Sequence, residues 1–155
     1  MKHKKTILLI VFLGALLWPL FTRCGANPSA GVERKDIPYF EAVNYFYIGG
    51  NGPIPDSKIC TDALFDSLFD TASHLDETCH PTPIDFSRQF VVAIVLPSTN
   101  RRQSVRLRHL TEQGNRLTLT YKLVNGPICS QKVRPMALAL VDRRYASKQI
   151  EIRRE

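Results

Sequence analysis

The sequence lacks the residue patterns by which most enzymes and metalloproteins are recognised. No segment carries a specific catalytic motif, and the 4 cysteines and 4 histidines form no paired C-x-x-C or H-x-x-x-H arrangement that would hold a metal ion. These absences favour binding over catalysis. We therefore predict no catalytic residue, no cofactor and no metal site.

Acidic residues are scarce towards the C-terminus. Residues 101–155 contain 13 basic and 4 acidic side chains, whereas residues 27–100 contain 4 basic and 10 acidic ones. Either the two halves complement each other within one fold, or the basic half forms a face for an acidic partner or an anionic surface. The first interpretation is favoured, because charges on strands usually mark a solvated face. Nucleic acid is excluded as a partner, since stacking aromatic residues do not alternate with the cations.

The first 26 residues have the order of an export signal. A basic start at Lys2, Lys4 and Lys5 precedes the apolar run Ile7–Leu20, and small residues end the segment at Ala26. We predict a signal peptide over 1–26, a flexible spacer over 27–38 and a single globular domain over 39–155. The mature protein would then be periplasmic or secreted.

Two alternatives to cleavage after Ala26 stay open. Cys24 could carry the lipid of a lipoprotein, although Arg23 fills a position that is usually small. Alternatively, Thr6–Thr22 could remain as a membrane anchor, although it is shorter than the roughly 20 residues that a spanning helix needs. In each case membrane contact is expected only through the N-terminal segment.

The hydrophobic pattern predicts an α+β fold. A strand is expected over Ala42–Ile48, and a helix over Thr61–Ala72 with Thr61 as its N-cap. Phe65 and Phe69 fall on the apolar face of that helix, which would pack them against a sheet. The further strands that the pattern predicts are Phe90–Leu96, Val105–His109, Leu117–Tyr121, Val133–Val141 and Gln149–Arg153.

These strands differ in the environment that their sequences predict. Phe90–Leu96 is continuously apolar and suits a central strand buried on both faces. Val105–His109 and Leu117–Tyr121 alternate, and Gly114 between them predicts a hairpin turn. The result is a mainly antiparallel sheet with one helix packed on it, with a β-sandwich carrying one helix as the alternative.

Three cysteines follow the signal segment, and an exported protein is exposed to oxidants. A disulfide is therefore expected. Cys60 and Cys79 flank the predicted helix, so that pairing is one candidate, and Cys60–Cys129 is the alternative. Sequence alone does not choose between them.

Possible metal ligands and nucleophiles crowd one polar segment, and these are His74, Asp76, Glu77, Cys79 and His80. Their spacing matches no known metal motif, and adjacent loop residues seldom face each other. A polar loop is therefore favoured. A hydrolase that uses the segment from His74 to Asp85 stays open as an alternative function.

The tetrapeptide Asn-Gly-Pro-Ile occurs twice. Asn51, Gly52, Pro53 and Ile54 recur as Asn125, Gly126, Pro127 and Ile128, each time after a strand with aromatic character. Asn-Gly-Pro is common turn chemistry, so chance is one explanation. The other is a pair of stiff exposed loops that bind a partner. The segment Pro97–Arg102, which ends in Arg101 and Arg102, is a third candidate binding loop.

Two segments of the chain carry a resemblance to known proteins. Thr61–Phe69 and Pro81–Ala93 resemble small exported proteins of unassigned function from Bacteroides-type bacteria, and more distantly the C-terminal domain of PrcB, an accessory lipoprotein of a secreted protease complex. The resemblance covers about residues 58–155. The chain departs from the PrcB-like pattern after the apolar strand, where that pattern has a loop containing Gly-Tyr and this chain has Ser98–Arg102 instead. The resemblance implies an exported α+β domain and a protease-associated or inhibitory role.

The sequence thus predicts an exported, non-enzymatic binding domain whose partner is another exported or envelope protein. An envelope structural protein that binds a glycan or lipid surface through its basic half is the alternative, alongside the hydrolase described above.

Overall fold

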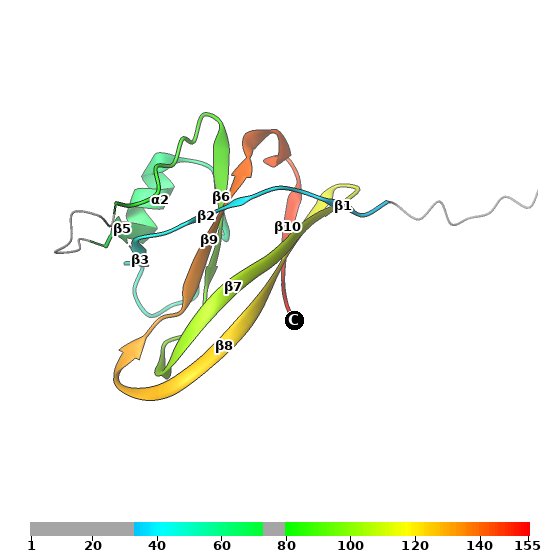
Figure 1. Ribbon diagram of the computed structural model, residues 1–155. Helices are drawn as coiled ribbons and strands as arrows, with labels where there is room; N and C mark the ends of the chain where they lie inside the picture. Colours follow the sequence, from blue (N-terminus) through cyan, green and yellow to red (C-terminus); the bar gives the residue numbers. More distant parts are fainter. Residues whose placement is uncertain (1–32, 73–79) are drawn as a thin grey trace, which may run out of the picture. The chain divides into compact units, whose positions relative to one another are not determined.

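The computed structural model describes residues 33–72 and 80–155, whose strands form three sheets (Figure 1). The hairpin sheet has the order β1-β7-β8-β10, and the central sheet has the order β2-β9-β6-β4. The small sheet pairs β3 with β5. The central sheet packs against the hairpin sheet on one face and against helix α2 with the small sheet on the other. The predicted α+β class, mainly antiparallel with a single short helix, is confirmed.

The bounds of the elements are as follows. The hairpin sheet contains β1 (Lys35–Asp36), β7 (Thr99–Gln113), β8 (Arg116–Val133) and β10 (Gln149–Arg154). The central sheet contains β2 (Phe40–Ala42), β4 (Lys58–Ile59), β6 (Gln89–Val95) and β9 (Met136–Asp142). The small sheet contains β3 (Tyr45–Tyr47) and β5 (Phe69–Thr71), and the helices are α2 (Asp62–Leu68) and the 3-10 turn η1 (Arg143–Tyr145).

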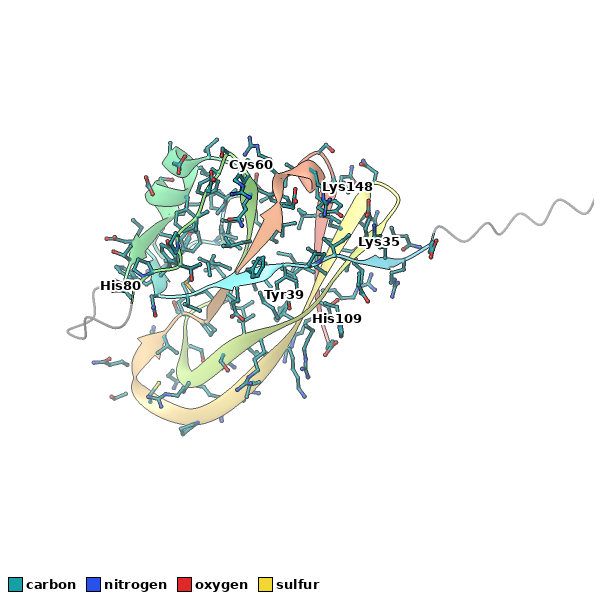
Figure 2. The ribbon with its side chains drawn as sticks, turned by 45° about the horizontal axis from the view of Figure 1, so that its top comes forward. Lys35, Tyr39, Cys60, His80, His109 and Lys148 are labelled. Carbon is teal, nitrogen blue, oxygen red and sulfur yellow. The ribbon has the colours of Figure 1, made fainter. Side chains whose placement is uncertain are left out.

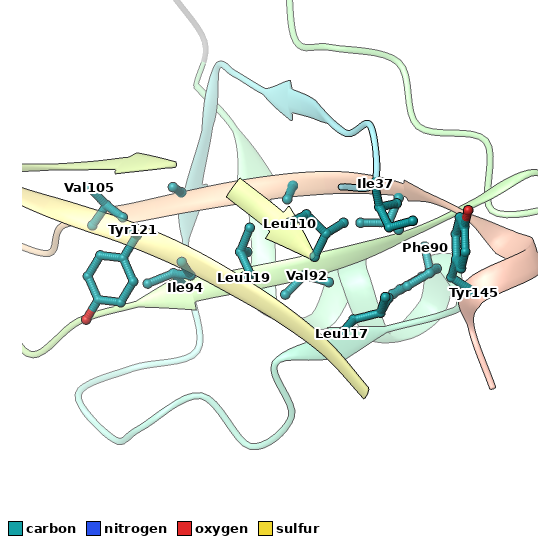
Figure 3. Packing of buried hydrophobic residues seen from close by; sticks show 13 residues of the cluster. Ile37, Phe90, Val92, Ile94, Val105, Leu110, Leu117, Leu119, Tyr121 and Tyr145 are labelled. Atoms are coloured by element: carbon teal, nitrogen blue, oxygen red, sulfur yellow. The ribbon is translucent and has the colours of Figure 1, made fainter. Parts of the chain in front are cut away.

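Strands β6 and β9 are buried on both faces, which explains their continuous apolar sequences. Along β6, Phe90, Val92 and Ile94 pack towards the hairpin sheet, while Val91 and Ala93 pack towards helix α2. The cluster between the two larger sheets is shown in Figure 3. The prediction that Phe90–Leu96 forms a central buried strand is confirmed.

Helix α2 begins as predicted but ends earlier. Thr61 is the N-cap, and its side-chain oxygen accepts a hydrogen bond from the Leu64 N–H at 3.4 Å. The predicted extension to Ala72 is wrong, because Phe69 leaves the helix and pairs with Tyr47 in the small sheet. Phe65 and Phe69 are nevertheless both buried, and their rings stack with centroids 5.1 Å apart.

The predicted strand Ala42–Ile48 is divided in two. Ala42 ends β2 in the central sheet, and Tyr45 begins β3 in the small sheet. Asn44 lies between them with φ of 65°, a left-handed conformation that asparagine tolerates better than most residues. This one residue redirects the chain from one sheet to the next.

The ordered structure also begins earlier than predicted. Lys35 and Asp36 pair with β7, and Ile37 is buried in the core between the two larger sheets. These residues therefore belong to the folded region rather than to the predicted spacer over 27–38.

At the other end of the chain, β10 lies at the edge of the hairpin sheet as expected, but it runs parallel to β8.

Neither cysteine in the described residues forms a disulfide. Cys60 and Cys129 are both free thiols, so the pairing Cys60–Cys129 is wrong. Cys60 packs against the core beside η1, whereas the Cys129 sulfur contacts the carbonyl oxygens of Asn100 and Gln131 at 3.2 and 3.1 Å. The two thiols thus belong to separate parts of the fold. Cys79, the partner in the other predicted pairing, lies outside the described residues.

The predicted hairpin is confirmed. Gln113 pairs with Arg116 across a two-residue turn in which Gly114 takes φ of 60°. Both strands continue far beyond the core, until β7 joins β6 and β8 joins β9. The two connections are linked, since the Leu96 N–H donates to the Pro135 carbonyl at 2.9 Å.

The candidate loops at this end are largely strand. Asn125–Ile128 lies within β8 and Arg101 within β7, so the prediction that they form free loops is wrong. Pairing explains the difference, because Gln103 pairs with Asn125 and Arg101 with Ile128. The register shifts between these pairs, and such irregularities let strands bend from one sheet to another. We call residues 99–106 and 122–134 the basic corner.

Candidate binding surface

The basic corner gathers cations with no acidic residue among them. Its basic side chains are Arg101, Arg102, Arg106, Lys122, Lys132 and Arg134. From Phe86 to Val141 the sequence contains a single acidic residue, Glu112, and it lies near the opposite end of the hairpin. Glu112 is already paired, because the Lys148 Nζ lies 2.6 Å from its Oε1. The charge of the corner is therefore not neutralised from within the hairpin.

Two of these cations face each other directly. Arg106 on β7 and Lys122 on β8 are cross-strand partners, and both side chains are exposed. Like charges directly opposite each other on adjacent strands are destabilising. None of the ion pairs formed by the described residues involves either side chain. This arrangement costs stability and leaves both cations available to an external anion.

Hydrogen bonds hold the corner in a fixed conformation. The Arg101 Nη1 donates to the Gly126 carbonyl at 3.0 Å, and the Gln103 Nε2 donates to the Asn125 Oδ1 at 2.7 Å. Gly126 packs so closely that a Cβ there would lie 2.9 Å from the Arg102 carbonyl oxygen. The repeated Asn-Gly-Pro-Ile segment thus has a structural role here, since only glycine fits this approach of two strands.

Exposed apolar side chains accompany the cations. Ile128 is 67% exposed and Val124 is 36% exposed, whereas no residue from Lys122 to Val133 is buried. Exposed aliphatic groups beside unpaired cations are the combination that a protein partner with acidic and apolar groups would contact. In Figure 2 this end of the hairpin carries its side chains outward.

The first Asn-Gly-Pro-Ile segment is a loop, as predicted, and Arg134 holds it at the corner. The Arg134 guanidinium donates to the carbonyls of Gly50 and Gly52 and lies 4.5 Å from the centre of the Tyr47 ring. Its Nε also donates to the Leu96 carbonyl at 3.2 Å. Arg134 therefore joins the loop to the connections between the two larger sheets.

The two repeated segments thus lie at one end of the fold but have different structures. Asn51–Ile54 is fixed through Arg134, whereas Asn125–Ile128 is fixed through β7. Among the described residues, no hydrogen bond joins one segment to the other. The sequence pointed to Arg101 and Arg102 but missed Arg106, Lys122 and Arg134. The charge count of residues 101–155 showed the excess of cations, but it did not show which of them come together at this end of the hairpin.

The polar segment that suggested a hydrolase lies mostly outside the described residues, namely His74, Asp76, Glu77 and Cys79. His80 is exposed, and it lies far from His109 in Figure 2. Within residues 33–72 and 80–155, no three His, Cys, Asp or Glu side chains come together as a metal site.

Asp85 lies at a groove of about 460 Å³, which Phe40, Ile84 and Leu140 line with apolar surface. Its carboxylate accepts hydrogen bonds from the Ser87 hydroxyl at 2.6 Å and the Ser87 N–H at 2.9 Å. The side-chain hydrogen bond from Ser87, followed by the backbone one, lowers the pKa of Asp85 below its ordinary value of 3.8. Asp85 thus stabilises the turn that leads into β6.

Comparisons of the chain with protein-family models, curated proteins and solved structures found no match. The resemblance to Bacteroides-type exported proteins and to PrcB stays a prediction. In the described residues, no helix combines the length and the apolar character that crossing a membrane requires.

Proposed function

We propose that this chain is an exported, non-enzymatic binding domain that engages an acidic surface of another exported or envelope protein through the basic corner. The observation that carries the proposal is the cross-strand pair Arg106–Lys122, two exposed cations opposite each other that have no acidic partner in the part of the chain that the structure describes. A sheet gains no stability from such a pair. An external anion is the group that would offset their repulsion.

The surroundings of this pair support a protein rather than a simple counter-ion as the partner. Val124 and Ile128 place exposed aliphatic surface beside the cations, and hydrogen bonds from Arg101 and Gln103 hold the strands in place. A surface that is ordered before binding loses little conformational entropy on association. The resemblance to PrcB makes an exported protease or its accessory subunit the first partner to test.

The experiment is affinity capture from an envelope extract of the source organism. The bait is the purified chain, and the test variant is Arg106→Gln/Lys122→Gln. We expect the captured protein to be acidic and its recovery to fall about tenfold or more with this variant, which corresponds to about 1.4 kcal/mol. Capture should also weaken as the salt concentration rises, because exposed charges are screened.

A matched control removes the same charge elsewhere. Arg144 and Arg154 are exposed and lie outside the basic corner, so Arg144→Gln/Arg154→Gln also removes two positive charges. This variant should capture the partner as the parent chain does. Equal losses of capture with both variants would show that capture depends on the net charge of the chain and not on the basic corner. Capture of glycan or lipid alone would favour the envelope structural role.

Export is a separate part of the proposal. Cleavage after Ala26 would leave a mature chain that begins at Asn27, and mass spectrometry of the protein purified from its source should find that terminus. A lipid-modified Cys24 would establish the lipoprotein form instead. Full-length protein in the cytoplasm would contradict export altogether.

A further inference from the structure

Among the strands of residues 33–72 and 80–155, none lies beside most of the outer edge of β7. On that side, β1 pairs only with Glu112 and Thr111, and the Ile37 N–H donates to the Leu110 carbonyl at 2.8 Å. Between β1 and β2 the chain then crosses to the central sheet, as Figure 1 shows. From Thr99 to His109, no strand of the described residues pairs with this edge.

An uncovered edge presents backbone donors and acceptors to which an extended chain can add as a further strand. The edge of β7 suits such pairing, because residues 99–113 contain no proline. The opposite edge of the hairpin is less suitable. Beyond Tyr121, where pairing with β10 ends, β8 contains Pro127, which has no N–H.

The side chains along β7 define what a neighbouring strand would meet. Arg106 is exposed, whereas Val105 is buried and Leu107 is half-buried against the core. Successive side chains of a strand point to opposite faces. An added strand would therefore place one row of side chains beside Arg106, with Lys122 one strand further away, and the other row beside Val105 and Leu107.

We propose that the partner contributes an extended acidic segment that adds to the outer edge of β7 as an extra strand, with acidic and aliphatic residues alternating. This inference rests on the proposed function, since it specifies how the acidic partner is held. Charge complementarity with Arg102, Arg106 and Lys122 selects an acidic segment. On the other face, Val105 and Leu107 belong to the apolar layer between the two larger sheets, and a strand that extends this layer would need aliphatic residues between the acids.

The probe is the blocked peptide acetyl-Glu-Val-Glu-Val-Glu-Val-Glu-amide, added to the purified chain. We expect saturable binding, with slower amide hydrogen exchange in residues 99–109 and no added protection in β10. The same peptide with lysine in place of glutamate should bind at least about tenfold more weakly. The variant Arg106→Gln/Lys122→Gln should weaken the acidic peptide, whereas Arg144→Gln/Arg154→Gln should not.

Backbone methylation separates strand addition from charge attraction. Two further peptides carry N-methyl groups on all glutamates or on all valines, so that together they block both edges of the peptide strand. Because an added strand bonds through one edge, at least one methylated peptide should lose binding about tenfold or more. If both methylated peptides bind as tightly as the unmethylated peptide, and amide exchange along β7 is unchanged, strand addition is overturned. The proposal of an acidic partner would then still stand. No binding of the acidic peptide, together with charge-dependent capture of a folded partner, would also overturn the inference alone.

Discussion

The central sheet and the basic corner are formed by consecutive strands, since β6 leads into β7 and β8 leads into β9, but they have opposite environments. Along β6, Phe90 to Ala93 are completely buried, and both faces of the strand are covered. From Lys122 to Val133 on β8, no residue is buried, and cations lie beside exposed aliphatic groups. The first region gains its stability from burial of apolar surface. The second contributes little burial, so its order depends on backbone pairing and on close packing at Gly126.

The difference in burial separates residues that stabilise the fold from exposed residues that are available to bind a partner. A cation in the corner can change without opening a cavity, whereas a buried ring cannot. Substitutions of side chains buried against the central sheet should therefore change stability, whereas substitutions of the exposed cations in the corner should change partner binding. The predictions below test that separation, from the largest expected effect to the smallest.

The largest effect should follow truncation of a buried ring. Phe69 is 3% exposed, stacks on Phe65 and meets the Tyr47 ring at 5.5 Å between centroids. Phe69→Ala should lower the free energy of unfolding by about 3–5 kcal/mol, measured by chemical denaturation. Ile128→Ala is the control in the corner and should change it by less than about 0.5 kcal/mol. Similar losses for the two variants would remove the distinction between the regions.

The two Asn-Gly-Pro-Ile segments offer a matched pair of glycines. A Cβ at Gly126 would lie 2.9 Å from the Arg102 carbonyl oxygen, whereas a Cβ at Gly52 would meet nothing within 4 Å. Gly126→Ala should therefore cost about 1–3 kcal/mol of stability, as overpacking does, and Gly52→Ala less than about 0.5 kcal/mol. Thermal and chemical denaturation of both variants would check this. Two equal effects would mean that the corner is not fixed by close packing.

Removing the like-charge pair should be nearly neutral for folding. Arg106→Gln/Lys122→Gln relieves a cross-strand repulsion, so the free energy of unfolding should stay the same or rise by a few tenths of a kcal/mol. The gain should shrink in high salt. A clear loss of stability at low salt would show that these cations have partners that support the fold.

The smallest effect concerns the exposed turn that leads into β6. Ser87→Ala removes the side-chain hydrogen bond that chiefly lowers the pKa of Asp85, so this pKa should rise towards 3.8 in an NMR titration. A lowered pKa in the folded state stabilises the protein above the unfolded value, and that stabilisation is lost as the pH falls through the folded value. Ser87→Ala should therefore lower the stability of the protein above about pH 4. It should leave the stability unchanged at a pH below both the folded and the unfolded pKa of Asp85. An unchanged pKa would contradict this account of the turn.

The sequence predicted the elements whose cause is local. Phe90–Leu96 is apolar throughout because both of its faces are covered, and Gly114 supplies the left-handed turn of the hairpin. It failed where distant pairing overrides a local preference. Phe69 keeps helical spacing from Phe65 but pairs with Tyr47, which lies 22 residues earlier in the numbering.

The same reason limited prediction of the candidate site. Asn125–Ile128 has typical turn residues, yet pairing with Arg101 and Gln103 holds it in a strand. The sequence did show that residues 101–155 are basic, and Arg106 alternates with apolar neighbours along its strand. It did not show that Lys122 lies opposite Arg106, because strand register is set by the turn at Gly114 and by the bulges that follow.

The most direct test of the central claim is capture of an acidic exported protein by the variant Arg106→Gln/Lys122→Gln, prepared with its folding confirmed. If the basic corner binds the partner, capture should fall about tenfold or more at unchanged stability, while Arg144→Gln/Arg154→Gln retains it. Full capture by the Arg106→Gln/Lys122→Gln variant would contradict the account, because the unpaired cations would then have no part in binding.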